Sequence, residues 1–162
     1  MRIELVQVGA DKKEILRNLM QFYIYDFSTF LDLEVDGATG SYPSYPDLDK
    51  WWDASSRHVP YLLNSGGYIA GFASVELLEG RRNADFYMTE FFVLRKYRRL
   101  GVGSDAAVQL FDKYQGTWLV SQISTNLPAQ MFWRKIIKKY TAGNYEEDSH
   151  FDNRQITQRF SS

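Results

Sequence analysis

The fold prediction for this chain depends on the stretch Leu94-Arg95-Lys96-Tyr97-Arg98-Arg99-Leu100-Gly101-Val102-Gly103-Ser104. A strand-like pattern ends at its start and a helical pattern begins at its end. Four basic residues precede two glycines, which let a backbone approach a bulky anion closely. Amide groups at a helix N-terminus attract anions. The stretch therefore predicts a phosphate or pyrophosphate site, to which Arg98 and Arg99 add forked hydrogen bonds.

The flanking patterns predict one domain over residues 1–162, of the α/β (α+β) class. We expect a mixed, mostly antiparallel central sheet of six to seven strands, flanked by about four helices. The segment 31–60 is irregular and rich in aromatic residues, with room for one short helix; it either forms a binding surface or packs over the core. The expected strands are 3–8, 61–64, 68–78, 86–94, 117–124 and 154–160, and the expected helices are 12–28, 104–114 and one that begins at Asn126 and ends before Gly143.

Composition narrows the class of protein. The chain has 162 residues, of which 44% are hydrophobic, as in an ordinary globular domain. A formal net charge of -1 gives no general attraction to nucleic acid or to an anionic membrane. No signal-peptide pattern or membrane-spanning apolar run is present. The chain lacks cysteine, which together with these absences leads us to expect a soluble, cytoplasmic protein. His58 and His150 have no partner at metal-ligand spacing, so we expect no metal site.

Three kinds of phosphate-binding loop have glycine patterns like that of this stretch. A Walker loop ends in Gly-Lys-Ser/Thr, and Gly103-Ser104 lacks the lysine. Residues 101–106 match a dinucleotide fingerprint, but that loop follows the first strand of its fold directly, and an acidic residue ends the next strand. Here four basic residues intervene, and the next strand ends in Ser121-Gln122-Ile123-Ser124. Neither of these two interpretations fits.

The third interpretation is a resemblance to a family. Residues 93–103 closely resemble the acyl-CoA loop of the GNAT family of N-acetyltransferases, whose core pattern is Gln/Arg-x-x-Gly-x-Gly/Ala. Arg98, Gly101 and Gly103 fill its three defining places. The order of elements along most of the chain also resembles that family. A purely structural alternative, a basic turn with glycines that start a helix, stays open.

The resemblance implies a GNAT-like acyl-CoA fold with acetyl-CoA as co-substrate. Backbone amides of residues 98–104 would hold the CoA pyrophosphate, and the edge of the preceding strand would pair with the pantetheine arm. A splay between that strand and the strand at 117–124 would admit the arm. Asn126 would bond the pantetheine, cap the following helix, or do both. The implied CoA-binding residues are Phe92, Val93, Leu94, Arg98, Arg99, Leu100, Gly101, Val102, Gly103, Ser104, Asn126 and Trp133.

Glu90 is the candidate catalytic base. Period-2 alternation predicts that it shares one face of the strand at 86–94 with Met88 and Phe92. A carboxylate among apolar neighbours has a raised pKa, which suits a base that deprotonates an amine. The family often places a glutamate near this point. The alternatives are a glutamate turned to solvent or one paired with an arginine.

The general acid is unassigned, and protonation of the thiolate by water is an open alternative, because a thiolate is only modestly basic. Many relatives carry a tyrosine on the helix after the asparagine, and Trp133 occupies that place here. An indole N–H does not titrate, so Trp133 cannot transfer a proton. It either lines the CoA channel or fills the core. Tyr140 lies two turns further along the helix, about 10 Å away, which makes it a poor substitute.

The expected activity is transfer of the acetyl group of acetyl-CoA to a primary amine, by direct attack within a ternary complex. The acceptor would be a small molecule or a peptide, bound under the aromatic segment 42–61 and near Glu90. The alternative is a CoA-binding regulatory module that is catalytically weak or inactive, which the missing tyrosine suggests. A homodimer is compatible with the resemblance, although no feature of the sequence selects it.

Overall fold

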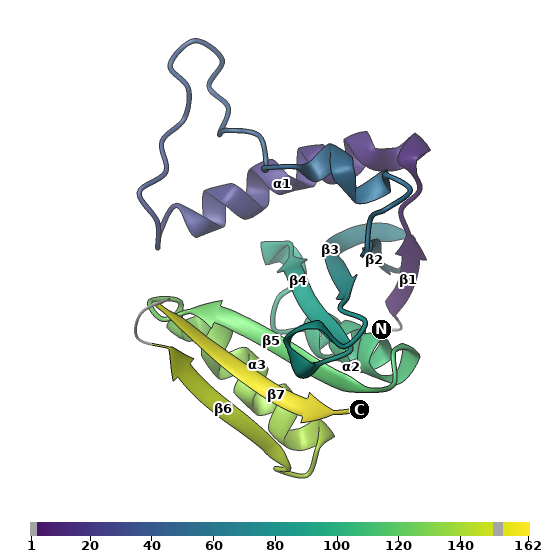
Figure 1. Cartoon of the computed structure of the whole chain (residues 1–162). Coiled ribbons are helices and arrows are strands. Elements are labelled where there is room, and N and C mark those ends of the chain that lie inside the picture. Colours follow the sequence, from purple (N-terminus) through teal and green to yellow (C-terminus); the bar gives the residue numbers. More distant parts are fainter. Residues whose placement is uncertain (1–2, 151–153) are drawn as a thin grey trace.

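A computed structural model describes residues 3–150 and 154–162 of the chain (Figure 1). The described strands form one seven-stranded sheet in the order β1-β2-β3-β4-β5-β7-β6. Only the β4–β5 pair is parallel among the pairs of this sheet. The elements are β1 (Ile3–Gln7), α1 (Lys13–Phe27), β2 (His58–Ser65), β3 (Tyr68–Leu77), β4 (Phe86–Val93), α2 (Val102–Lys113), β5 (Thr117–Ile123), α3 (Leu127–Tyr140), β6 (Tyr145–His150) and β7 (Gln155–Ser161), with short 3-10 helices η1 (Ala10–Lys12), η2 (Leu48–Trp52), η3 (Arg81–Asn83) and η4 (Arg95–Tyr97).

The sheet separates two hydrophobic clusters. On one face α1 and η2 cover side chains such as Phe72 and Phe92. On the other face α2 and α3 cover a larger cluster that includes Phe111 and Trp118, both fully buried. Each large apolar side chain buried in this way contributes roughly 1.5–3 kcal/mol. The sheet is therefore held between two layers of helix.

The predicted class and the mostly antiparallel sheet are confirmed. The described residues contain three α-helices rather than about four, because the irregular segment forms only the short η2. The strand β6 was missed, since Glu146, Glu147 and Asp148 resemble a solvated acidic run. An edge strand tolerates such residues, because one of its sides faces no neighbouring strand.

The parallel strands β4 and β5 diverge partway along their length. Their register runs through Phe86↔Trp118, Tyr87↔Leu119 and Met88↔Val120 and then ends. Beyond that point β5 continues to pair with β7 as far as Ile123↔Gln155, while β4 continues along β3 to Val93. The predicted splay between these strands is therefore present, and it exposes the β5-facing edge of the end of β4.

A β-bulge lies where the splay begins. Ser74 of β3 pairs with Glu90 and Val75 pairs with Met88, so Thr89 is an extra residue in β4. The extra residue reverses which side chains share a face. Met88 therefore packs in the α2–α3 cluster, whereas Phe92 packs under α1. The prediction that Met88 and Glu90 share a face is wrong, because strict alternation does not pass through a bulge.

Between α1 and η2 the chain makes a long excursion that projects from the body (Figure 1). It returns to α1 at Tyr42, whose backbone N–H donates to the Gln21 side chain at 2.9 Å and whose carbonyl accepts from it at 3.2 Å. This pair of bonds fixes the start of the aromatic segment. The next residues then reach the α1-covered face of the sheet at Tyr45.

Candidate active site

A cavity of about 490 Å³ lies at the splayed end of β4, between α1 on one side and the start of α2 and α3 on the other. It brings together residues far apart in the sequence. The cavity is lined by seven of the predicted CoA-binding residues, namely Phe92, Val93, Arg98, Arg99, Gly103, Asn126 and Trp133. Among the other predicted residues, Val102 is buried in the core and Leu94 is half-buried. Leu100 and Gly101 are exposed on the loop, and Ser104 is exposed in the first turn of α2.

The two loop glycines are required for different reasons. Gly101 precedes the first residue of α2 with φ of 83°, a left-handed conformation that favours glycine. Gly103 lies in the first turn of α2, where a Cβ would stand 3.1 Å from two ring carbons of Phe132 and 3.4 Å from Val93 Cγ2. The helix start can therefore approach α3 and β4 closely, and Gly103 lines the cavity.

Arg98 connects the loop to α1. Its Nε donates to the Val93 carbonyl at 2.7 Å, and its guanidinium also pairs with the Asp26 carboxylate. Arg95 donates to the same carboxylate at 3.1 Å. The Asp26 side chain is only 19% exposed. Asp26 thus holds Arg98, one of the two arginines predicted to bind phosphate, together with its neighbour Arg95.

Replacing Asp26 with asparagine is expected to tighten CoA binding by about threefold to tenfold at low salt, because a negative charge is removed beside the predicted pyrophosphate site. Calorimetric titration with CoA at two salt concentrations measures this, and the gain should shrink at high salt. Asp49→Asn is the control, since Asp49 pairs with Lys13 and Arg17. Weaker binding by Asp26→Asn would show instead that Asp26 orients the arginines for phosphate.

Glu90 is held by two phenols. The Tyr23 hydroxyl donates to its Oε2, and the Tyr45 hydroxyl donates to its Oε1. Burial raises the pKa of Glu90 above its usual value of 4.5, while the two hydrogen bonds act in the opposite direction. The raised pKa agrees with the sequence argument. Among the described residues the partners of the carboxylate are phenols, so neither the solvent-facing nor the arginine-paired alternative holds.

Trp133 packs on the opposite face of β4 from Glu90. It is 5% exposed, and its ring meets that of Phe91 edge to face with centroids 5.0 Å apart. It therefore fills the core and also lines the cavity. The Tyr140 hydroxyl donates to Asp112 at 2.9 Å, near the C-terminal end of α2, whereas the cavity loop precedes the N-terminal end of that helix. Its hydroxyl is thus engaged elsewhere.

His58 is half-buried. Its ring stacks on Trp51 with centroids 4.9 Å apart, and Nδ1 lies 3.5 Å from Thr89 Oγ1 at the bulge. Burial lowers the pKa of His58, which favours the neutral ring. The side chain of His150 lies outside the described residues. In the part of the chain that the structure describes, no three His, Cys, Asp or Glu side chains are grouped so as to hold a metal ion.

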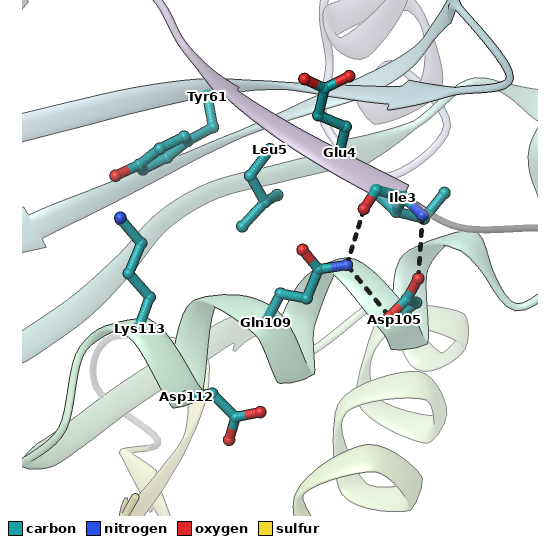
Figure 2. A pocket seen from close by; sticks show the side chains of 8 residues that line it. All are labelled: Ile3, Glu4, Leu5, Tyr61, Asp105, Gln109, Asp112 and Lys113. Carbon is teal, nitrogen blue, oxygen red and sulfur yellow. Dashed lines mark hydrogen bonds between the residues drawn. The ribbon is translucent and has the colours of Figure 1, made fainter.

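A second and wider hollow, of about 1020 Å³, lies between β1 and α2 (Figure 2). Asp105 accepts from the Ile3 backbone N–H at 3.2 Å, and Gln109 donates to the Ile3 carbonyl at 2.9 Å. These side chains therefore join the edge strand to the helix. The lining residues include three carboxylates, those of Glu4, Asp105 and Asp112, against one cation, Lys113, and this excess of negative charge disfavours a phosphate ligand. The smaller cavity beside β4 is the better candidate.

Sequence reasoning missed Tyr23, Asp26 and Tyr45. In the sequence, Tyr23 lies four residues after Leu19 and four before Phe27, which puts it on the apolar face of its helix. A buried tyrosine hydroxyl needs a hydrogen-bond partner, so a phenol on that face was a signal that could have been used. Asp26 lies one turn further along the same face, where a carboxylate also needs a partner. Which partners they find depends on tertiary packing.

This architecture is similar to that of known acetyltransferases. The family model described as "Acetyltransferase (GNAT) family" matches residues 27–137, more than half of the chain. No curated protein sequence matched. An acetyltransferase from Thermus thermophilus superposes with a TM-score of 0.71 at 12% identity, covering 100% of this chain and 98% of that one.

Two further solved structures share the fold. An aminoglycoside acetyltransferase from an uncultured soil metagenomic sample, in complex with sisomicin, has a TM-score of 0.62 at 15% identity and covers 92% of this chain and 93% of its own. A protein provisionally identified as a streptothricin acetyltransferase, from Bacillus anthracis str. Ames, in complex with acetyl coenzyme A, has a TM-score of 0.51 at 16% identity. It covers 80% of this chain and 81% of its own.

No helix among the described residues is long and apolar enough to cross a membrane. With the loop, the splayed strands and the family match in agreement, the chain belongs to the GNAT acetyltransferase family, whose co-substrate is acetyl-CoA.

Proposed function

We propose that this protein transfers the acetyl group of acetyl-CoA to a primary amine, by direct attack within a ternary complex. The observation that carries the proposal is the position of Glu90. A half-buried carboxylate with a raised pKa lies on β4, and Tyr23, which donates to it, lines the cavity at the splay. A base in that position can remove a proton from an ammonium or amine that attacks a thioester in the cavity.

Acetyl-CoA fits the residues of this cavity. Backbone amides at the start of α2 and the side chain of Arg99 would bind the pyrophosphate. The exposed edge of β4 at Phe91–Val93 would pair with the amides of the pantetheine arm in the manner of an added strand. Asn126 caps α3 by accepting from the Ala129 backbone N–H at 3.1 Å. Because the cap uses its oxygen, its amide nitrogen can donate to a pantetheine carbonyl.

The acceptor would enter from the side of Tyr45 and the aromatic segment 42–61. Rings in this segment can stack on a cation. The two ligand-bearing relatives do not select an acceptor, because one is an aminoglycoside enzyme and the other is named for streptothricin. A small molecule and a peptide amine are both compatible with the cavity. The second candidate function is a CoA-binding module, which Trp133 favours because it does not titrate.

Thiol release from acetyl-CoA in the presence of a panel of amines tests the proposal. The panel should include polyamines, aminoglycosides, amino acids and peptides with free N-termini or lysines. Turnover above the hydrolysis rate, with an acetylated product identified by mass, supports the transferase. Tight CoA binding without turnover on any of these amines supports the module.

The pH dependence of turnover should report Glu90. Its carboxylate must be ionised to act as a base, and its pKa is raised above 4.5 by burial. Activity should therefore rise as pH increases through this raised pKa and level off above it. In Glu90→Gln this rise of activity on the acidic side of the pH profile, the acidic limb, should be absent. A limb that survives in Glu90→Gln would show that the acceptor's own amine, rather than Glu90, produces it.

A further inference from the structure

Tyr23 occupies a place between the cavity and the carboxylate. Its ring lines the cavity and meets the Phe92 ring edge to face, with centroids 5.6 Å apart. Its hydroxyl donates to Oε2 of Glu90, while Tyr45 occupies Oε1. The carboxylate is thus approached by two phenols through different oxygens. Of these two, Tyr23 is the one whose side chain lines the cavity.

The geometry of α1 and β4 places Tyr23 at the reacting end of the cavity. Asp26, which contacts Arg98, marks the phosphate end. Tyr23 lies three residues before Asp26, one turn or about 5 Å away along the helix. Along β4, Glu90 lies three residues before Val93, about 10 Å from the loop. If the proposed function is correct, an arm that runs from the loop along β4 brings its thioester toward Tyr23 and Glu90.

We infer that Tyr23 gives its hydroxyl proton to the departing sulfur of CoA and recovers a proton from Glu90. The residue at the usual tyrosine place, Trp133, does not titrate, and the Tyr140 hydroxyl is bonded to Asp112. Tyr23 supplies from α1 the proton donor that α3 lacks.

The step balances without a further reactant. The amine nitrogen forms a bond to the thioester carbonyl carbon, and Glu90 takes a proton from that nitrogen. The carbon–sulfur bond then breaks and its electron pair goes to sulfur. The Tyr23 proton moves to sulfur, and Glu90 returns a proton to the Tyr23 oxygen. The products are the amide and the free thiol of CoA, and both side chains end in their starting protonation states.

Coupling between the two groups orders these transfers. Burial, followed by the charge of Glu90, raises the pKa of Tyr23 well above its usual value, so the phenol keeps its proton while Glu90 is ionised. Once Glu90 has taken the proton from the amine, that negative charge is gone. Tyr23 therefore becomes a stronger acid than it was before the reaction only after the amine has attacked.

Tyr23→Phe and Tyr45→Phe form a matched pair, because each removes one phenol from Glu90. Tyr23→Phe should lower kcat on acetyl-CoA by about 10²–10³-fold, with the Kd for CoA changed by less than about threefold. The second donor is the oxygen-ester analogue of acetyl-CoA, whose alkoxide is more basic than a thiolate and needs the acid more. The loss of kcat in Tyr23→Phe should be larger with this analogue than with acetyl-CoA. Tyr45→Phe should instead lower kcat by the same factor with both donors.

Two results would overturn the relay. If Tyr23→Phe lowers turnover of both donors by the same factor, Tyr23 only positions Glu90, and the relay alone fails. If the wild-type protein binds CoA but releases no thiol with any amine of the panel, the proposed function fails and the relay fails with it. Because the second result appears in the wild type, it cannot be confused with the first.

Discussion

Glu90→Gln is expected to lower the rate of acetyl transfer by about 10²–10⁴-fold, the usual contribution of a general base. Glutamine has nearly the same shape and can still accept a hydrogen bond from one phenol, but it cannot take a proton. Thiol release under saturating acetyl-CoA measures the effect on kcat. Affinity for CoA should stay nearly constant, since the carboxylate lies beyond the predicted phosphate and pantetheine contacts.

Glu76→Gln is the matched control for this experiment. Glu76 is a partly buried glutamate on the neighbouring strand β3, and it pairs with Arg81 at 3.0 Å. Its replacement by glutamine should leave turnover unchanged. Equal losses in the two variants would argue that any glutamate lost from the sheet perturbs the site, and Glu90 would lose its assignment as base.

Stability provides a second check on Glu90→Gln. The raised pKa means that the folded state disfavours the charged carboxylate, so Glu90 costs stability at neutral pH. This cost vanishes as pH falls toward the unfolded value near 4.5. The variant should therefore gain unfolding free energy relative to wild type as pH rises through this window. Loss of activity in a variant at least as stable as wild type cannot be attributed to unfolding.

Gly103→Val is expected to abolish CoA binding. A Cβ at this position would already stand 3.1 Å from the Phe132 ring, and the additional methyl groups of valine must displace that ring or tilt the start of α2. Either movement would misplace the amides that are expected to bind the pyrophosphate. A thermal scan with CoA at 100 times its Kd should show a shift of about 5–10 °C for wild type and none for the variant.

Two companion variants separate site loss from misfolding. Gly37→Val adds the same side chain where no atom lies within 4 Å, and it should keep the CoA shift. Arg99→Glu changes only an exposed side chain at the cavity and should weaken CoA binding about tenfold or more, by replacing attraction with repulsion. A full CoA shift in both Gly103→Val and Arg99→Glu would remove this loop from the binding site.

The parts of the fold that the sequence predicted depend on local chemistry. The loop Arg98–Gly103, the helix that follows it and the cap at Asn126 each arise from short-range backbone requirements that a sequence displays. The order of strands and helices along the chain could be predicted for the same reason, since period and turn residues mark each element. These features were sufficient to suggest the phosphate end of the site.

The reacting end was less accessible to sequence reasoning. The bulge at Thr89 has no signature in residues 86–94, and it decides that Glu90 faces α1 rather than the α2–α3 core. The partners of Glu90 come from positions 67 and 45 residues away. Such contacts depend on how α1 and the segment after it pack on the sheet. Residue type showed that Tyr23 and Asp26 need partners, but only the packing shows which partners they have.

A crystal structure of the protein with CoA bound tests the central claim most directly. The account predicts the pyrophosphate on the amides of residues 98–104, the pantetheine paired with Phe91–Val93, and the sulfur within reach of the Tyr23 hydroxyl on the side of Glu90. CoA bound in the hollow between β1 and α2, or with its thiol directed away from β4, would contradict it.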